Sequence, residues 1–258
     1  MSDDVPLTWV DQVASTQVTL VARAREGAPV QALATTHQTA GHGRRGRAWV
    51  CPPGGGLALS VLLRPRRADG WTWLPLLTGV AVVRAVERVR ARSGPPQAPP
   101  LAPPSAQALR LKWPNDVLDP DDAKLAGLLA ERVDQPSAPV ACVLGIGVNL
   151  RTADAPEGAV GLDSLGVRCA ADDMARALLD EILSWVSLWE HDDAAVTGAY
   201  RDACSTLGQV VRVSLPDGTQ VSGPAVGVDA HGRLVVQQGV DEVALSAGDV
   251  VHLRPAER

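Results

Sequence analysis

Apolar residues recur at helical spacing in two stretches of the first third of the chain. One covers residues 17–25 and follows Ser15 and Thr16, whose hydroxyls suit a capped helix start. The other covers residues 73–90, where the apolar positions fall on one face: Leu76, Val80, Val83 and Val86. The spacing therefore predicts two amphipathic helices.

Shorter apolar runs between and after these stretches predict strands. They cover residues 30–36, 57–63, 109–113, 126–133 and 140–150. Residues 93–107 hold six prolines and predict an exposed, mobile connection, not a domain boundary. Helices and strands mixed in this way predict an α+β fold with a mixed or antiparallel sheet.

The last third of the chain changes pattern. Asp172 or Asp173 can cap a third helix whose apolar side chains form one stripe: Met174, Leu178, Ile182, Trp185 and Trp189. From about Gly208 the chain turns to short alternating strands separated by Asp/Gly turns, which predict a small β-barrel. We expect one large domain over residues 1–206 and a barrel domain over residues 207–258.

Composition excludes several classes of protein. No uncharged apolar stretch of membrane-spanning length and no signal peptide is present, so we expect a cytoplasmic protein without a membrane partner. A net charge of −5 argues against nucleic acid as a partner. The cysteines, Cys51, Cys142, Cys169 and Cys204, show no metal-ligand spacing, and we expect reduced, mostly buried thiols.

Lysine usage singles out one segment. Of 24 basic residues only Lys112 and Lys124 are lysines, because the chain otherwise uses arginine. A lysine offers a compact point charge that a guanidinium does not reproduce. The segment between them carries Trp113-Pro114-Asn115-Asp116, which is turn chemistry. We expect a hairpin with both lysines on neighbouring strands and Asn115 and Asp116 near its tip. Two cations and a carboxylate gathered in this way suit a nucleotide with a divalent cation, although a Lys-Asp salt bridge on a hairpin would look alike.

A glycine- and arginine-rich segment runs from Gln38 to Arg47 and reads QTAGHGRRGR, with Trp49 two residues later. It contains G-x-G-x-x-G, but the prolines and glycines that follow forbid the helix of a dinucleotide fingerprint. Glycines let backbone N–H groups converge on an anion, and arginines add charge-assisted hydrogen bonds. The segment therefore predicts a loop that grips a carboxylate and phosphates, although a solvated basic loop would look alike.

A third segment, from Val143 to Leu150, is an apolar strand whose single polar side chain is Asn149. Its glycines, Gly145 and Gly147, are typical of close approach by a ligand or another backbone. A buried asparagine must find hydrogen-bond partners. By itself this segment would be read as core.

Taken together and in order, these segments resemble the catalytic domain of biotin-protein ligases, from about Asp11 to Leu150. The resemblance rests on the glycine-arginine loop and on the motifs KWPND (112–116), KLAG (124–127) and G-x-G-x-N-L (145–150). It implies a fold similar to that of class II aminoacyl-tRNA synthetases, followed by an SH3-like barrel. It also implies the short form of the family, without an N-terminal DNA-binding domain.

The resemblance implies ATP-dependent activation of biotin to biotinyl-5'-AMP, followed by transfer to a lysine of a biotin carboxyl carrier domain. The residues implied to bind biotin are Ser15, Thr16, Gln17, Gln38, Gly41, His42, Gly43, Arg44, Lys124 and Gly127. Those implied to bind ATP and the adenylate are Arg44, Arg45, Arg47, Trp49, Lys112, Asn115 and Asn149. Gln17 and His42 depart from the family's usual asparagine and arginine, which puts their side-chain contacts in doubt.

The chemistry agrees with these roles. A carboxylate must attack the α-phosphorus of ATP, so Arg44, Lys124 and a Mg²⁺ ion brought by ATP would offset the repulsion between two anions. The protein itself is expected to fix no metal, although Mg²⁺ could lie near Asp116. Asp116 is also the candidate acceptor of the amine proton during transfer.

Other functions remain open from the residues alone. Lipoate or octanoate ligases and transferases belong to the same superfamily, and a non-catalytic biotin sensor would bind without reacting. The complete set of loop arginines and both lysines argue against an inactive copy. We expect a monomer or a weak homodimer.

Overall fold

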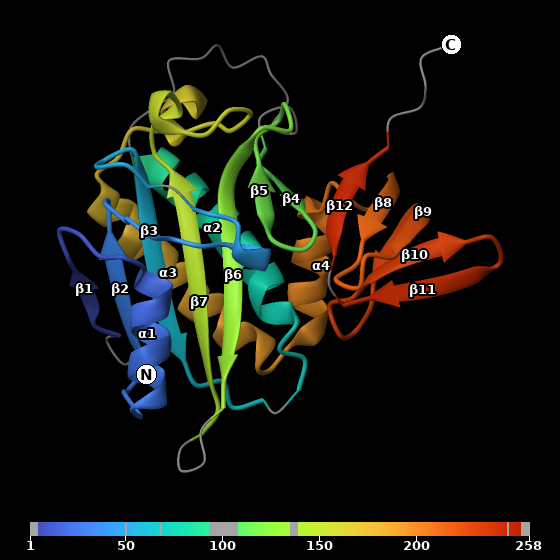
Figure 1. Cartoon of the computed structure of the whole chain (residues 1–258), viewed down its shortest axis with the longest axis horizontal. Coiled ribbons are helices and arrows are strands. Elements are labelled where there is room, and N and C mark those ends of the chain that lie inside the picture. The colour runs from blue at the N-terminus through green and yellow to red at the C-terminus, as the bar shows by residue number, and fades with distance from the viewer. Residues whose placement is uncertain are drawn as a thin grey trace.

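Two sheets and four α-helices make up the computed structural model, which describes residues 5–49, 51–67, 69–92, 108–134, 139–246 and 248–253 (Figure 1). The proline-rich stretch 93–107 lies outside these residues. The predicted α+β class is confirmed. Within the described residues, we find no helix long and apolar enough to cross a membrane.

A seven-stranded mixed sheet forms the larger part of the molecule. In spatial order its strands are β1 (Leu7–Trp9), β2 (Gln31–Thr35), β3 (Gly56–Leu63), β7 (Ala141–Asn149), β6 (Lys124–Val133), β5 (Asp116–Leu118) and β4 (Arg110–Lys112). Only the β1–β2 pair is parallel; the other named pairs are antiparallel. The five predicted strands are present, whereas β1 and β5 were not predicted.

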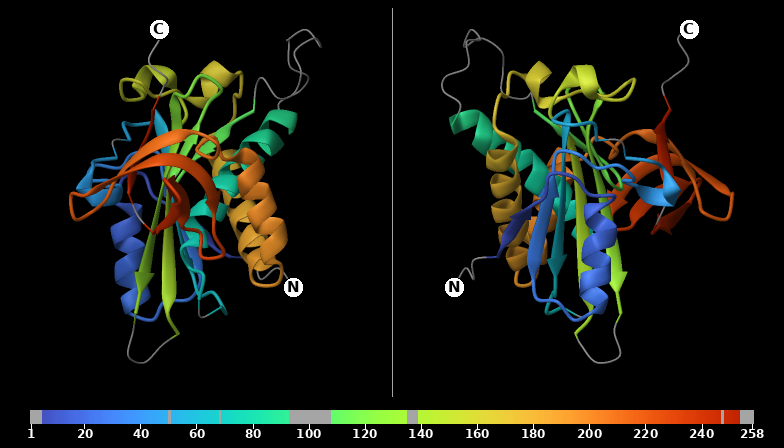
Figure 2. Two further views of the ribbon diagram at one scale, coloured as in Figure 1. Left: turned by 90° about the vertical axis from the view of Figure 1, so that its right-hand side faces the viewer. Right: turned by 60° about the vertical axis from the view of Figure 1, so that its left-hand side comes forward.

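Helices cover both faces of this sheet and enclose two separate cores. On one face lies α1 (Thr16–Arg25), packed on a small cluster that includes Leu20, Leu33 and Val143. On the other face lie α2 (Trp73–Arg92), α3 (Ala171–Trp189) and α4 (Asp193–Ala203), which build the main core (Figures 1 and 2). The α1 face is thus covered only in part, and this leaves room for a cavity.

Strand β7 explains which side chains face that room. Successive side chains of a strand point to opposite faces. Cys142, Leu144, Ile146 and Val148 belong to the main core. The alternate positions Gly145, Gly147 and Asn149 therefore point to the α1 face, so that the glycines leave the middle of the sheet bare.

The C-terminal strands form a five-stranded antiparallel sheet. Its order is β11 (Asp241–Leu245), β10 (Leu234–Gln238), β9 (Gln220–Val228), β8 (Val210–Ser214) and β12 (Asp249–His252). This sheet is fastened to the larger unit, since the Trp113 indole N–H donates to Gly232 O at 3.2 Å and that of Trp73 to Ala230 O at 2.9 Å. The division into domains at residues 206 and 207 stays a prediction.

Three local predictions were incomplete or wrong. Neither Asp172 nor Asp173 caps α3; Ala170 holds the N-cap position and both carboxylates lie in the first turn, where they favour the positive end of the helix dipole. Lys112 and Lys124 are not on neighbouring strands, because β5 lies between β4 and β6. The helix α4 was not predicted.

The cysteines agree with the sequence-based expectation. All four are free thiols, and three of them are buried: Cys51, Cys142 and Cys204. Burial raises the pKa of the Cys142 thiol to about 12. A thiol in this environment stays protonated and unreactive at neutral pH.

Candidate active site

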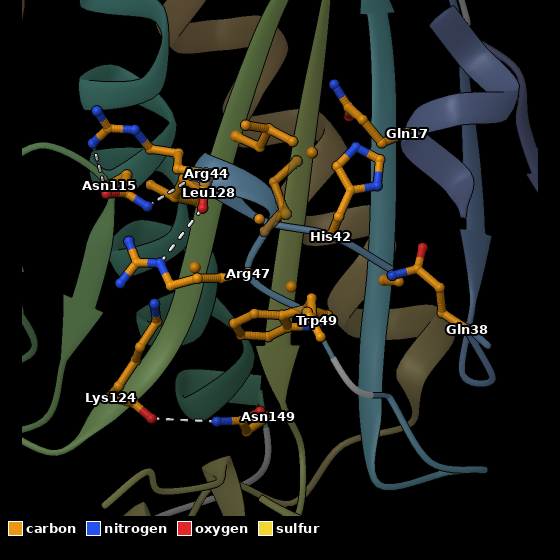
Figure 3. Close-up of a pocket in the computed structure, with 18 of the residues that line it drawn as sticks. Gln17, Gln38, His42, Arg44, Arg47, Trp49, Asn115, Lys124, Leu128 and Asn149 are labelled. Atoms are coloured by element: carbon orange, nitrogen blue, oxygen red, sulfur yellow. Dashed lines mark hydrogen bonds between the residues drawn. The ribbon is translucent and has the colours of Figure 1, made fainter. Parts of the chain in front are cut away.

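A cavity of about 260 Å³ lies on the α1 face of the seven-stranded sheet (Figure 3). The start of α1, the glycine-arginine loop, strands β3, β6 and β7 and the segment 156–159 contribute to its walls. The predicted site residues that line it are Ser15, Thr16, Gln17, Gln38, His42, Gly43, Arg44, Arg47, Trp49, Asn115, Lys124, Gly127 and Asn149.

The part of the cavity next to α1 holds a network of buried hydrogen bonds. The Thr16 N–H donates to Gln38 Oε1 at 2.9 Å, and Thr16 Oγ1 lies 2.9 Å from Ser60 Oγ. The Ser60 hydroxyl donates to Gln17 Oε1 at 3.3 Å, and Gln17 Nε2 donates to Val143 O at 3.0 Å. Buried polar groups need partners. A ligand with donors and acceptors can take over some of these bonds.

Trp49 lies across the bare middle of the sheet (Figure 3). Gly127 and Gly147 face each other in the register of β6 and β7. A Cβ at Gly147 would collide with the Trp49 indole, and one at Gly127 would lie 2.7 Å from its Cζ3 atom. The two glycines are therefore required for this position of the aromatic ring.

Cationic side chains occupy the side of Trp49 away from Gln17 and His42 (Figure 3). Lys124 Nζ lies 5.7 Å from the Trp49 ring centroid and donates to Asp116 Oδ1 at 2.6 Å. Arg44 and Arg47 belong to the glycine-arginine loop. In such a partly buried place, positive side chains interact favourably with a carboxylate or phosphate of a ligand.

Two asparagines hold these cations in position. Asn149 Nδ2 donates to the backbone carbonyl of Lys124 at 3.2 Å. Asn115 Oδ1 accepts from Arg44 Nη1 at 3.2 Å, while Asn115 Nδ2 donates to Leu128 O at 3.2 Å. Each amide thus ties a charged residue to a strand.

The glycine-arginine loop is a narrow hairpin. The Gly43 N–H donates to Arg47 O at 2.6 Å, and the Trp49 N–H donates to Gly41 O at 2.9 Å. Its tip is the short 3-10 turn η1 (Arg44–Gly46), in which Arg45 has a left-handed φ of 56°. Such a φ is uncommon for a residue other than glycine.

Arg44 is partly desolvated. Burial is the largest influence on its guanidinium and lowers its pKa, as do Arg45 and Arg47, whereas Asp249 and Asp116 act in the opposite direction. Arginine remains charged in proteins at physiological pH. Arg44 is therefore a cation held at the edge of a low-dielectric cavity.

Some predicted residues do not line the cavity. Gly41 does not line the cavity but leaves space for the Gln38 side chain, because a Cβ at position 41 would collide with it. Asp116 does not line the cavity but contacts Lys124, which does, and Arg45 turns toward the C-terminal sheet, where it pairs with Asp249 at 2.8 Å. Lys112 lies near His252 of β12, whose pKa it helps to lower.

Other residues line the cavity without having been predicted. The set comprises Ala48, Ala58, Leu59, Ser60, Leu128, Leu129, Ile146 and residues 156–159. Gly145 and Gly147 also line the cavity, and they were predicted as points of close approach by a ligand or another backbone. Ser60 alternates with core residues in β3, so it was detectable as a polar residue in an apolar run. His42 also meets an unpredicted partner, since its Nε2 lies 3.9 Å from Glu131 Oε1 on β6.

The arrangement suits one kind of ligand. Neutral donors and acceptors gather at the α1 end, apolar walls follow, and the cations lie beyond Trp49. Such a cavity fits a polar, uncharged head group with an acidic tail, next to a flat ring that carries phosphates. Among the described residues, no group of three or more potential metal-ligating side chains lies together.

Comparison with known proteins agrees with this geometry. The model of the biotin/lipoate A/B protein ligase family matches residues 11–149, and that of the biotin protein ligase C-terminal domain matches residues 206–253. A biotin--[acetyl-CoA-carboxylase] ligase of Mycobacterium tuberculosis is 41% identical over 96% of this chain and 89% of its own length.

Solved structures show the same fold. A biotin protein ligase of Aquifex aeolicus in complex with biotin and ATP has a TM-score of 0.75 and 24% identity over 97% of this chain and 99% of that one. A biotin protein ligase of Leishmania major in complex with biotinyl-5-AMP has a TM-score of 0.63 and 26% identity over 97% of this chain and 99% of that one. The chain therefore belongs to the biotin/lipoate A/B protein ligase family, as a biotin protein ligase with the C-terminal domain of these enzymes.

Proposed function

We propose that this cavity joins biotin to ATP and then passes the biotinyl group to a lysine of a biotin carboxyl carrier domain. The observation that carries the proposal is the meeting of Arg44 and Lys124 with a buried hydrogen-bond network in one cavity. The two cations come from segments 80 residues apart, so their convergence is a property of the fold.

Biotin binds with its ureido ring at the α1 end. The ring presents one carbonyl and two N–H groups, which match the hydroxyl and amide groups of Thr16, Gln38 and Ser60. Ser15 and Gln17 complete this end. The backbone of His42 and Gly43 then follows the valeryl chain toward Lys124, with Gly127 beneath it.

In the first reaction, a carboxylate oxygen of biotin attacks the α-phosphorus of ATP. A new oxygen–phosphorus bond forms, the bond to the β-phosphate oxygen breaks, and pyrophosphate leaves. Lys124 and Arg44 offset the charge that gathers on the phosphoryl oxygens. Trp49 packs on the adenine, with Arg47, Asn115 and Asn149 close to the nucleotide.

The Mg²⁺ ion that accompanies ATP needs few protein ligands. It commonly binds through one or two carboxylates and the substrate's phosphates, and it supplies positive charge to the phosphates. Asp116, 2.6 Å from Lys124 Nζ, is the carboxylate in the right neighbourhood. We propose no other ligand.

In the second reaction, the lysine amine of the carrier attacks the carbonyl carbon of the mixed anhydride. A carbon–nitrogen bond forms, AMP leaves and the amine loses a proton, for which Asp116 is our candidate acceptor. Before that moment the loop must keep water from the adenylate.

The free thiols suit a reducing compartment, and we propose that the enzyme works in the cytoplasm.

The direct test mixes the purified protein with Mg²⁺-ATP, biotin and a carrier domain, and follows carrier mass by mass spectrometry. We expect a gain of one biotinyl group, and no gain when lipoate replaces biotin. Lys124→Ala should slow adenylate formation at least about 100-fold, because it removes a charge that acts in the transition state.

The control is Arg84→Ala, which removes an exposed cation of α2 that pairs with Glu87 far from the cavity. It should leave the rate unchanged. Transfer of lipoate at the biotin rate, or a Lys124→Ala rate near that of the wild type, would contradict the proposal.

A further inference from the structure

The tip of the glycine-arginine loop is held by the C-terminal sheet. Arg45 Nη1 lies 2.8 Å from Asp249 Oδ2, and Arg47 Nη2 lies 3.0 Å from Asp249 Oδ1, so one carboxylate binds both arginines. Arg45 Nη2 also donates to Ser214 O at 3.1 Å, and Arg44 Nη1 to Gly248 O at 3.4 Å. Every arginine of the loop thus contacts β8, β12 or the residue before β12.

The loop has an electrostatic reason to need this carboxylate. Arg44, Arg45 and Arg47 lie within four positions. Burial is the largest cause that lowers the pKa of Arg44, Asp249 raises it, and the two neighbouring arginines lower it. Like charges this close repel each other. Asp249 offsets the repulsion at the tip, where the backbone already carries the left-handed Arg45.

The two arginines bound by Asp249 have different surroundings. Arg47 lines the cavity, whereas Arg45 does not and points to the C-terminal sheet. Asp249 itself does not line the cavity, and it contacts the cavity wall through Arg47. A residue so placed can fix where the loop lies without taking part in the chemistry.

We infer that Asp249 is a positioning residue that holds the arginine loop over the cavity, and that retention of the acyl-adenylate depends on this contact between the two sheets. The second half of the inference rests on the proposed function. The half-exposed setting of both ion pairs makes the hold weak, with up to about a five-fold effect on an equilibrium for each pair. A weak hold suits a loop that must open for substrates.

The first test asks whether Asp249 holds the loop in the ligand-free protein. Limited trypsin digestion of the full chain, with fragments mapped by mass spectrometry, reports access to the bonds after Arg44, Arg45 and Arg47. Asp249→Asn keeps the shape of the side chain and removes its charge. We expect cleavage in the loop to become about three- to ten-fold faster.

Two further variants sharpen this test. Asp241→Asn makes the same change on β11, at the opposite edge of the sheet, and should cleave like the wild type. Arg45→Gln removes the other partner as well as one cleavage site, so only cleavage after Arg44 and Arg47 is compared. Combined with Asp249→Asn, its effect should be smaller than the sum of the two single changes, because both remove the Arg45–Asp249 pair.

The second test measures retention of the intermediate. Protein loaded with biotin and Mg²⁺-ATP, then freed of excess ATP, should lose adenylate about three- to ten-fold faster in Asp249→Asn than in wild type or Asp241→Asn. Biotin affinity should stay within two-fold. About 0.5 M salt should bring the wild type toward the variant and change the variant little, since screening weakens exposed ion pairs.

The outcomes are separable. Equal loop cleavage in Asp249→Asn and wild type would overturn the inference, as would equal adenylate loss or fully additive effects with Arg45→Gln. Faster loop cleavage in Asp249→Asn, together with no adenylate formed by the wild type or any variant, would support the positioning role of Asp249 and contradict the proposed function.

Discussion

Glycine at two positions of the sheet decides where Trp49 can lie. The indole covers Gly127 and Gly147, and a side chain at either position would occupy its space. The ring is thereby held flat beside Lys124, whose ammonium lies 5.7 Å from its centroid. In the proposed function this is the surface against which adenine packs.

We expect Gly147→Ala to raise KM for ATP about ten-fold, because the new methyl group displaces the indole. Biotin affinity, measured by calorimetry, should change less than three-fold, since the buried network near α1 is left intact. The matched control is Gly227→Ala on β9, where an added Cβ meets no atom within 4 Å. An unchanged KM for ATP in Gly147→Ala would show that the adenine of ATP does not pack against Trp49.

Residue types could be assigned to the cavity more easily than contacts. The glycine-arginine loop was predicted because glycines and arginines together suit an anion, and Lys124 because lysine is uncommon in this chain; the loop and Lys124 line one cavity. Arg45 and Lys112 carry the same charge but do not line the cavity: Arg45 pairs with Asp249, and the charge of Lys112 acts on His252 of the C-terminal sheet. An arginine or lysine in a sequence shows that an anion can be bound. Only the fold determines which anion lies next to it, and for Arg45 that anion is the Asp249 carboxylate.

At the scale of elements, the start of α1 serves both folding and the cavity. Ser15 is the N-cap, and its side chain accepts from the Val18 N–H at 3.3 Å. Ser15 and the first residues of the helix, Thr16 and Gln17, also line the cavity. One short stretch therefore ends a loop, begins a helix and presents polar groups to the cavity.

We expect Ser15→Ala to lower the free energy of unfolding by about 1 kcal/mol, the usual effect of losing an N-cap side chain. Denaturant unfolding measures this loss. Ser15→Asn should retain most of the stability, because asparagine caps equally well, yet should weaken biotin binding by crowding the cavity. If the two variants were equally stable, the cap would not be the source of the effect.

Four of the five strands predicted in the large sheet are runs of five or more residues, and the two that were missed have three residues each, as does the predicted β4. The three-residue strands β1 and β5 lack a run long enough to show a period. They exist because neighbouring strands offer unpaired backbone groups. The α3 cap was misassigned for a related reason, since an acidic residue suits both the cap and the first turn.

Across the whole molecule, one histidine lies where the two sheets meet. His252 Nε2 lies 3.2 Å from Thr206 Oγ1, which also accepts the N–H of Trp113 at 3.0 Å. Burial is the largest cause that lowers the pKa of His252, and the charge of Lys112 acts in the same direction. The folded protein thus favours the neutral imidazole.

Because the pKa of His252 is lowered in the folded state, the free energy of unfolding decreases as the pH decreases. Above the unfolded value of about 6.5, both states are neutral at this site. Below it the unfolded chain takes up a proton that the folded protein resists, so stability is lost as pH decreases. We expect the unfolding free energy to drop more between pH 7.5 and 5.5 in wild type than in His252→Gln. Parallel curves would exclude this histidine as the cause.

The anchoring of the loop by Gly248 and Asp249 also has a consequence for biosynthesis. A ribosome makes the loop some 200 residues before it makes the strand that fastens it. A nascent chain can therefore assemble the floor and walls of the cavity while its cover still lacks an attachment. Competence to keep a reactive intermediate would arrive only once β12 has left the exit tunnel and joined the sheet.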